Sequence, residues 1–141
     1  MEFQELVDKS QSIEVTYCVD PEVYFNFQRT SLDYNPLHTD EAFALKKGFY
    51  EKVMYGNILN AFISHFVGMV LPTRDVMIQT QDIQYRKPVY LGDTLLLSTS
   101  IEKISAAVEI INYKLNFYRV NNESRELVAT GHVQIGILHD K

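Results

Sequence analysis

An aspartate and a histidine lie five residues apart, on either side of a proline. The segment reads Ser31-Leu32-Asp33-Tyr34-Asn35-Pro36-Leu37-His38. Proline keeps the residue before it out of the helical region, so Asn35-Pro36 predicts a rigid turn. Such a turn can bring the side chains of Asp33 and His38 together, and a carboxylate beside an imidazole can move protons near neutral pH. Taken singly, Asp33 is better explained as a turn cap and His38 as a structural histidine, and it is the spaced set that predicts an acid–base pair.

Two helices are expected to follow this pair and to position it. Thr39 or Asp40 can cap a short helix that begins near Glu41. A long helix is predicted over residues 55–71, and Pro72 ends it because proline cannot continue the hydrogen-bond ladder. Apolar residues recur through it at helical spacing, and the broad stripe needs a large apolar surface to lie on. The stripe consists of Ile58, Leu59, Phe62, Ile63, Phe66, Val67 and Val70.

The second half of the chain offers that surface, because its apolar residues alternate with polar ones at a period of two. Such alternation predicts antiparallel strands with one buried face. The strands are expected over residues 13–19, 77–85, 95–101, 111–117 and 127–137, with a hairpin connection at 120–124. On the last strand, the face expected to be buried carries Leu127, Ala129, Gly131, Val133, Ile135 and Ile137. We therefore predict a single α+β domain over residues 1–141, in which an antiparallel sheet wraps around one long central helix.

The composition excludes several classes of protein. With 141 residues, 46% apolar residues and a net charge of −5, the chain is expected to be a globular domain and not a nucleic-acid binder. Its single cysteine, Cys18, allows no internal disulfide and fits a reducing compartment, so a cytoplasmic location is expected. The apolar stretch at 55–71 is too short and too polar to span a bilayer. Four scattered histidines have no metal-site spacing, so we expect no metal.

Three segments resemble the MaoC-like family, which has the hotdog fold and includes the (R)-specific enoyl-CoA hydratases. The family signature reads roughly Gly-Asp-x-Asn-Pro-x-His, and it is matched in identity and spacing by Asp33, Asn35, Pro36 and His38. Residues 55–57, Tyr-Gly-Asn, are similar to the family's His-Gly-Met at the start of the central helix. Residues 85–95 are similar to its Lys-Pro-Val…Gly-Asp strand entry. The resemblance covers roughly residues 30 to 100, about half the chain, and the first block is the most specific.

The resemblance implies a hydratase or dehydratase that interconverts (R)-3-hydroxyacyl and trans-2-enoyl thioesters without a cofactor. Asp33 and His38 would hold and activate the water, and one of them would return the proton. A backbone N–H at the helix start, at Gly56, would stabilise the enolate oxygen, while Asn35 fixes the turn beside the substrate. Arg86 and Lys87 are candidates to meet the phosphates of coenzyme A or the acidic surface of an acyl-carrier protein. The exposed edge of a single hotdog sheet is commonly used for pairing, so a homodimer is also expected.

Three departures from the family pattern affect the expected substrate contacts. Leu32 replaces the glycine before the aspartate, so either the loop differs or Leu32 narrows the acyl pocket. Tyr55 replaces the histidine before the helix glycine, and Ala61 stands where a hydroxyl-bearing residue is often found. Two other functions therefore stay open. A hotdog acyl-thioesterase needs a carboxylate on or near the long helix, and residues 55–71 contain none. A non-catalytic acyl-thioester binding protein would have Asp33 and His38 pointing away from any cavity.

Overall fold

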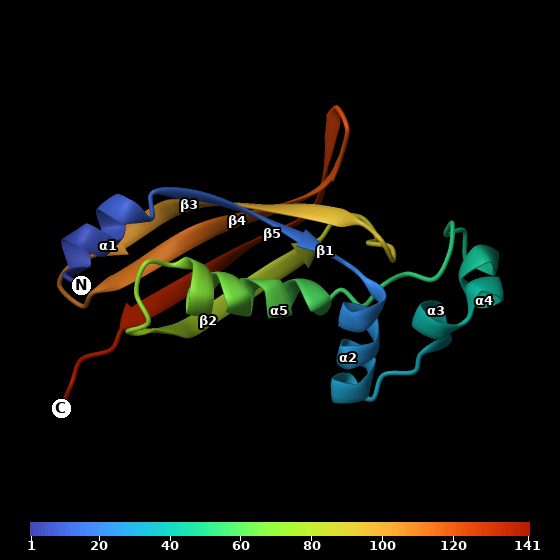
Figure 1. The fold of residues 1–141 in the computed structure, drawn as a ribbon, viewed down its shortest axis with the longest axis horizontal. Helices are drawn as coiled ribbons and strands as arrows, with labels where there is room; N and C mark the ends of the chain where they lie inside the picture. Colours follow the sequence, from blue (N-terminus) through green and yellow to red (C-terminus); the bar gives the residue numbers. More distant parts are fainter.

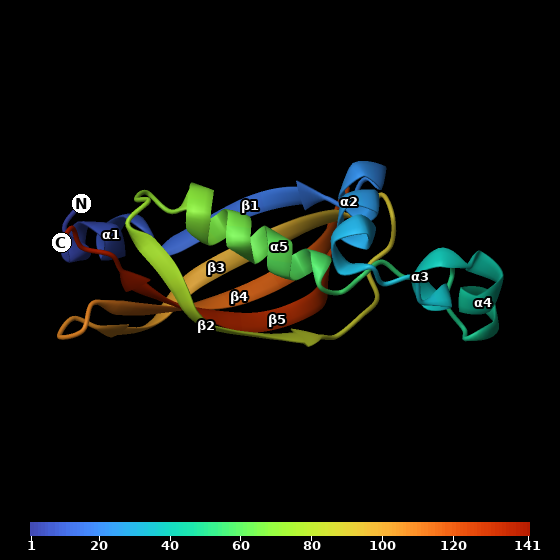
Figure 2. The ribbon, with the colours of Figure 1, turned by 90° about the horizontal axis from the view of Figure 1, so that it is seen from below.

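The computed structural model describes residues 1–141 and contains one curved, five-stranded antiparallel sheet that wraps around helix α5 (Figures 1 and 2). The strand order is β1-β3-β4-β5-β2, which leaves β1 and β2 at the two edges of the sheet. All five expected strands are present, so the predicted α+β arrangement is confirmed. Their bounds are Ser12–Cys18 (β1), Val76–Tyr85 (β2), Thr94–Ser105 (β3), Ile110–Asn121 (β4) and Ser124–Ile137 (β5).

The central helix is shorter than the sequence predicts. Regular α-helix covers Ile58–His65 (α5), and a single π-helical turn, Phe66–Val70 (η1), completes it before Leu71. Residues 55–57 instead form a tighter lead-in turn, in which the amide N–H groups of Ile58 and Leu59 donate to carbonyls three residues earlier. The prediction of a helix beginning at residue 55 was therefore wrong by three residues, and this difference leaves backbone N–H groups free near the site.

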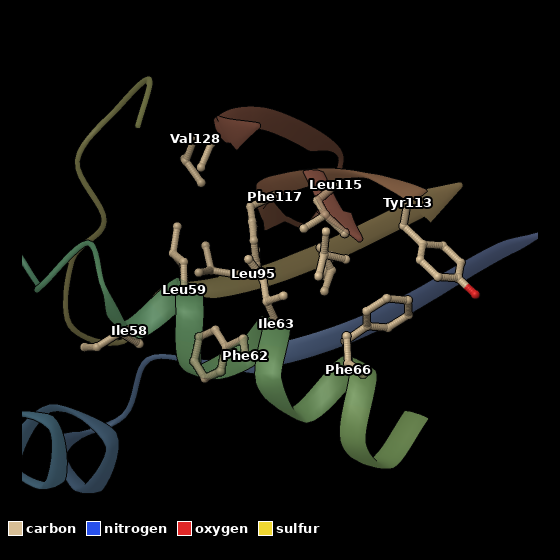
Figure 3. Packing of buried hydrophobic residues seen from close by; sticks show 14 of the residues in the cluster. Ile58, Leu59, Phe62, Ile63, Phe66, Leu95, Tyr113, Leu115, Phe117 and Val128 are labelled. Atoms are coloured by element: carbon tan, nitrogen blue, oxygen red, sulfur yellow. The ribbon is translucent and has the colours of Figure 1, made fainter. Parts of the chain in front are cut away.

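The predicted apolar stripe of the central helix packs against the concave face of the sheet (Figure 3). One cluster of 24 buried residues joins α5, η1 and strands β3 to β5. In the view of Figure 3, side chains of the helix point toward those of the strands, with Phe66 lying edge-on to Tyr113 at 5.5 Å between ring centroids. Burying this much apolar area is the main favourable term holding the helix in the sheet.

One expected core position was wrong. Leu127 was predicted on the buried face of β5, but Val128 is buried there and Leu127 is only half-buried. The cause is a β-bulge, because Phe117 pairs with Ala129 while the next residue of β4 pairs with Leu127. The bulge adds one residue to β5 and so turns the side chains before it to the other face.

Three short helices gather at one end of the sheet, beyond the first turn of α5, and both chain termini lie at the opposite end (Figures 1 and 2). They are α2 (Pro21–Ser31), α3 (Pro36–Thr39) and α4 (Glu41–Lys46), and α1 (Phe3–Lys9) lies near the termini. Of the two caps considered for α4, Asp40 is the one used, since its side chain accepts from the amide of Phe43. None of the helices combines the length and the apolar content that a membrane crossing requires.

Candidate active site

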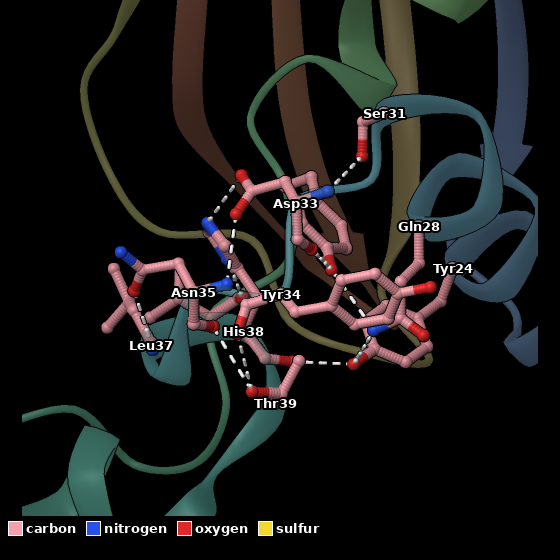
Figure 4. Close-up of polar contacts among 11 residues, drawn as sticks. Tyr24, Gln28, Ser31, Asp33, Tyr34, Asn35, Leu37, His38 and Thr39 are labelled. Atoms are coloured by element: carbon pink, nitrogen blue, oxygen red, sulfur yellow. Dashed lines mark hydrogen bonds and ion pairs between the residues drawn. The ribbon is translucent and has the colours of Figure 1, made fainter.

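Asp33 and His38 face each other at the end of the sheet where α2 and α3 meet (Figure 4). Asp33 Oδ2 lies 3.8 Å from His38 Nε2, and the side chains are 45% and 16% exposed, respectively. The other ring nitrogen, Nδ1, lies 2.6 Å from the carbonyl oxygen of Val53. A carbonyl oxygen only accepts, so Nδ1 carries the proton. In the neutral ring, Nε2 therefore presents its lone pair toward Asp33.

The turn that joins the pair is built as the sequence predicts. The amide of Asn35 donates to Asp33 Oδ1 at 3.0 Å, which closes the backbone on the aspartate side chain. Asn35 in turn caps α3, because its side-chain oxygen accepts from the amide of Leu37 at 2.9 Å. Pro36 occupies the first helical position, where its missing N–H costs nothing. Asn35 thus holds the turn, and its predicted contact with substrate stays a prediction.

Leu32 takes the conformation that glycine would take. Its φ of 59° lies in the left-handed region, where it ends α2 and its amide donates to the carbonyl of Gln28. The side chain is 73% exposed and turned to solvent. The chain therefore adopts the left-handed conformation with a leucine, and the exposed Leu32 side chain does not narrow the cavity at His38.

A cavity of about 410 Å³ opens beside His38, and its wall is continued by Gly56 and Asn57 at the start of the central helix. The amide N–H of Gly56 donates to no acceptor in the protein. A Cβ on Gly56 would lie 2.9 Å from the ring of Tyr85, so only glycine fits against that ring. A free N–H at a helix start, with the helix dipole behind it, favours a negatively charged oxygen.

The remaining predicted site residues fall in different places. Arg86 and Lys87 both line the cavity, but Lys87 is paired with Glu126 at 2.8 Å. Arg86 lies within 3.2 Å of Gln84 Oε1 and 3.4 Å of Thr130 Oγ1. Ala61 lines a second, largely apolar cavity of about 550 Å³ between α2 and α5. The structure therefore places His38 and Gly56 at one cavity, with Asp33 facing His38 at 3.8 Å, and places Ala61 at another.

Tyr55 is 3% exposed and lies behind the ring of His38, at 4.3 Å between ring centroids. Its contacts are with the segment that carries the acid–base pair, so its predicted contact with substrate stays a prediction. Burial raises the pKa of the Tyr55 phenol, which keeps it protonated at neutral pH.

Two further residues beside Gly56 were not among the predicted site residues, Asn57 at the helix start and Tyr85 at the end of β2. The side chain of Asn57 accepts from the hydroxyl of Tyr85 at 3.2 Å, and both residues line the cavity beside Gly56. Burial also raises the pKa of Tyr85. Tyr85 follows from no local pattern, because it reaches the helix only through the pairing of β2 at the sheet edge. No group of three or more His, Cys, Asp and Glu side chains is placed to hold a metal ion.

Comparisons with known proteins show the family of the chain. The MaoC-like domain model matches residues 2–121. An (R)-specific enoyl-CoA hydratase of Aeromonas caviae is 31% identical over 75 residues, which is 53% of this chain and 56% of that protein. Another (R)-specific enoyl-CoA hydratase, from Rhodospirillum rubrum, is 22% identical over 114 residues, or 81% of this chain and 79% of that protein. The match to the Aeromonas relative thus spans only about half of that protein's length.

Among solved structures, the (R)-hydratase from A. caviae involved in PHA biosynthesis superposes with a TM-score of 0.80 at 22% identity, covering 90% of this chain and 94% of that one. R-hydratase PhaJ1 from Pseudomonas aeruginosa gives a TM-score of 0.79 at 24% identity, covering 92% of this chain and 81% of that one. The architecture is that of a hotdog-fold protein. Within that class, the chain belongs to the MaoC-like family.

Proposed function

We propose that the protein is a hydratase or dehydratase that interconverts 3-hydroxyacyl and trans-2-enoyl thioesters. The observation that carries the proposal is the 3.8 Å separation between Asp33 Oδ2 and His38 Nε2, beside a cavity that also exposes the free N–H of Gly56. Both atoms are acceptors and form no hydrogen bond with each other, but a water molecule can lie between them and donate one hydrogen to each.

The water would then present a lone pair to the β-carbon of an enoyl thioester. As the C–O bond forms, one hydrogen of the water passes to Asp33 or His38, and the electron pair of the double bond moves onto the thioester oxygen. The N–H of Gly56 would stabilise this enolate, as donors aimed at a developing charge do. Return of the proton to the α-carbon completes the addition of one water, and the reverse sequence is dehydration.

The acyl carrier is either coenzyme A or an acyl-carrier protein, and both present a phosphorylated group. Arg86 lies at the cavity and has no carboxylate partner, whereas the charge of Lys87 is offset by Glu126. Of the two cations, Arg86 is therefore the better candidate to meet a phosphate.

The test is hydration of crotonyl-CoA, followed as loss of the enoyl-thioester absorbance band. The wild-type protein is expected to bleach the band, and Asp33→Asn and His38→Gln to slow the reaction by about a hundredfold or more, as loss of an acid–base group does. Asp40→Asn is the matched control, because Asp40 lies in the same segment but caps α4. This control is expected to keep most of the activity.

Other outcomes would contradict the proposal. Release of free thiol while the carbon–carbon double bond survives would mean that the protein is a thioesterase. If neither signal changes with coenzyme A or carrier-protein thioesters of several chain lengths, the hydratase is excluded for these substrates and the non-catalytic acyl-thioester binding protein remains. Equal rates for wild type and Asp33→Asn would show that the chemistry occurs elsewhere.

We also propose that the protein is a homodimer. Strand β2 is 10 residues long and has one unpaired edge at the border of the sheet. An edge of this kind is a template for pairing, and a second copy would satisfy its backbone groups.

A further inference from the structure

One glutamine on α2 bonds to two tyrosines that belong to different segments. Gln28 Nε2 donates to the hydroxyl oxygen of Tyr24 at 3.2 Å and to that of Tyr55 at 3.1 Å. Tyr24 lies one helical turn before Gln28, while Tyr55 lies in the lead-in turn to α5. An amide nitrogen carries two hydrogens, so both bonds can form at the same time.

Each tyrosine then donates its own hydrogen to the backbone of one member of the acid–base pair. The hydroxyl of Tyr24 donates to the carbonyl oxygen of His38 at 2.6 Å (Figure 4). The hydroxyl of Tyr55 donates to the carbonyl oxygen of Asp33. Because the glutamine supplies a hydrogen to each phenol oxygen, each phenol hydrogen is free to go to a carbonyl. The chain of donors runs in one direction on both branches, and bonds arranged in this way strengthen one another.

The aromatic rings of Tyr24 and Tyr55 add packing contacts to these hydrogen bonds. Tyr24 and Tyr55 are each 3% exposed and stack with 5.7 Å between their ring centroids. Tyr55 also lies against the imidazole of His38, whose Nδ1 is fixed by Val53. The cavity at His38 is lined by neither of the two tyrosines and not by Gln28. These three side chains therefore contact the segment of the acid–base pair without lining this cavity.

We propose that Gln28, Tyr24 and Tyr55 form a positioning device that sets the distance and orientation between Asp33 and His38. The three are positioning residues, since they act through the backbone carbonyls and the His38 ring and touch no substrate. This inference rests on the proposed hydratase function, because it says what fixes the gap in which the water lies. Errors of about 1 Å in such a gap can cost a hundredfold in rate, so a device of this kind has a measurable effect.

The test separates positioning from simple structural support. Tyr24→Phe and Tyr55→Phe each remove one hydroxyl. Gln28→Met removes both donated hydrogens of the side chain. Gln28→Glu keeps the size of the side chain, but its carboxylate accepts hydrogen bonds where glutamine donates them. At position 28, a carboxylate would take the two phenol hydrogens and withdraw them from the carbonyls of Asp33 and His38. We expect kcat for crotonyl-CoA hydration to fall about tenfold or more, with the largest loss for Gln28→Glu and KM within about twofold of wild type.

Tyr17→Phe is the matched control. Its hydroxyl also donates to a backbone carbonyl, that of Phe62 at 3.2 Å, and its ring also stacks, at 4.4 Å from Phe62. It should lower the melting temperature about as much as Tyr24→Phe does, yet leave kcat unchanged. Tyr24→Phe and Gln28→Met combined should cost little more in kcat than Gln28→Met alone, because Gln28→Met already breaks the branch through Tyr24. Equal kcat losses in Tyr17→Phe and Tyr24→Phe would overturn the proposal.

A second readout does not depend on activity. The NMR signal of the His38 ring, assigned by its loss in His38→Gln, should change its chemical shift in Tyr24→Phe and Gln28→Glu but not in Tyr17→Phe. An unchanged His38 chemical shift in every variant would overturn the positioning role. If the wild-type protein hydrates no thioester while the His38 signal still responds to Gln28→Glu, the proposed function fails and the positioning role stands.

Discussion

His38 and Gly56 show how single atoms define the site. The bond from Nδ1 to the Val53 carbonyl leaves Nε2 as the only ring atom that can accept a proton beside Asp33. The Gly56 amide is free because the chain enters α5 through a tight turn, and the absence of a side chain lets the Tyr85 ring approach. The orientation of the His38 ring and the free amide of Gly56 both depend on close contacts. Small substitutions at these residues should therefore change the hydration rate.

Gly56→Ala is expected to reduce hydration of crotonyl-CoA by tenfold or more. The added Cβ would lie 2.9 Å from the ring of Tyr85, so the ring or the lead-in turn must shift, and the N–H donor moves with it. Steady-state kinetics and the melting temperature provide the check. Gly68→Ala in η1 is the control, because a Cβ there meets nothing within 4 Å, and it should leave activity intact. Full activity in Gly56→Ala would exclude this amide as the enolate donor.

Helix α2 has two separate tasks in positioning the site. Its last turn ends in the left-handed residue Leu32, which directs the chain toward Asp33, and its inner face carries Tyr24 and Gln28. Left-handed backbone is unfavourable for a leucine, and its exposed side chain gains little from burial. Strain of this kind beside an active site is maintained by the surrounding structure.

Leu32→Gly is therefore expected to stabilise the protein, by up to about 1 kcal/mol, because glycine adopts a φ of 59° without steric cost. Urea unfolding of the two proteins measures the difference. Leu45→Gly gives the opposite case, since Leu45 is also exposed, at 53%, but lies within α4. That substitution should destabilise by about 0.5–1 kcal/mol. A destabilised Leu32→Gly protein would show that the leucine side chain makes a contact worth more than the strain.

At the scale of the whole molecule, the acid–base pair lies at one end of the sheet. The outer edge of strand β2 is unpaired. The helices α2 to α4 extend past the end of the sheet (Figures 1 and 2). At the β2 edge, Met77 is 53% exposed, and Met69 of the neighbouring η1 is 59% exposed. Exposed methionines beside an unpaired strand are typical of a surface that a second subunit covers.

Sedimentation equilibrium is expected to give a mass of twice 16.3 kDa. Two lysines at this surface, in Met69→Lys combined with Met77→Lys, should shift the equilibrium to the monomer, because each charge would have to be buried on pairing. Ile104→Lys is the control, as Ile104 is 40% exposed on β3, and it should keep the dimer. A wild-type protein that remains monomeric at high concentration would contradict the homodimer.

Local patterns in the sequence determine much of this protein. Period-two alternation predicts all five strands, the apolar stripe predicts which face of the central helix is buried, and Asn35-Pro36 predicts the turn that joins Asp33 to His38. These features follow from neighbours a few residues apart, where steric limits and hydrogen bonds of the local chain decide the outcome.

Only the tertiary structure decided the rest, because it depends on residues that are distant in the sequence. The bulge that buries Val128 in place of Leu127 arises from pairing between β4 and β5. Gly56 meets Tyr85 only because β2 pairs at the sheet edge. Gln28 reaches Tyr55, 27 positions further along the chain, only once α2 has docked beside α5. Long-range packing of this kind leaves no periodic trace in the sequence, so the groups that hold the acid–base pair became visible only in the folded molecule.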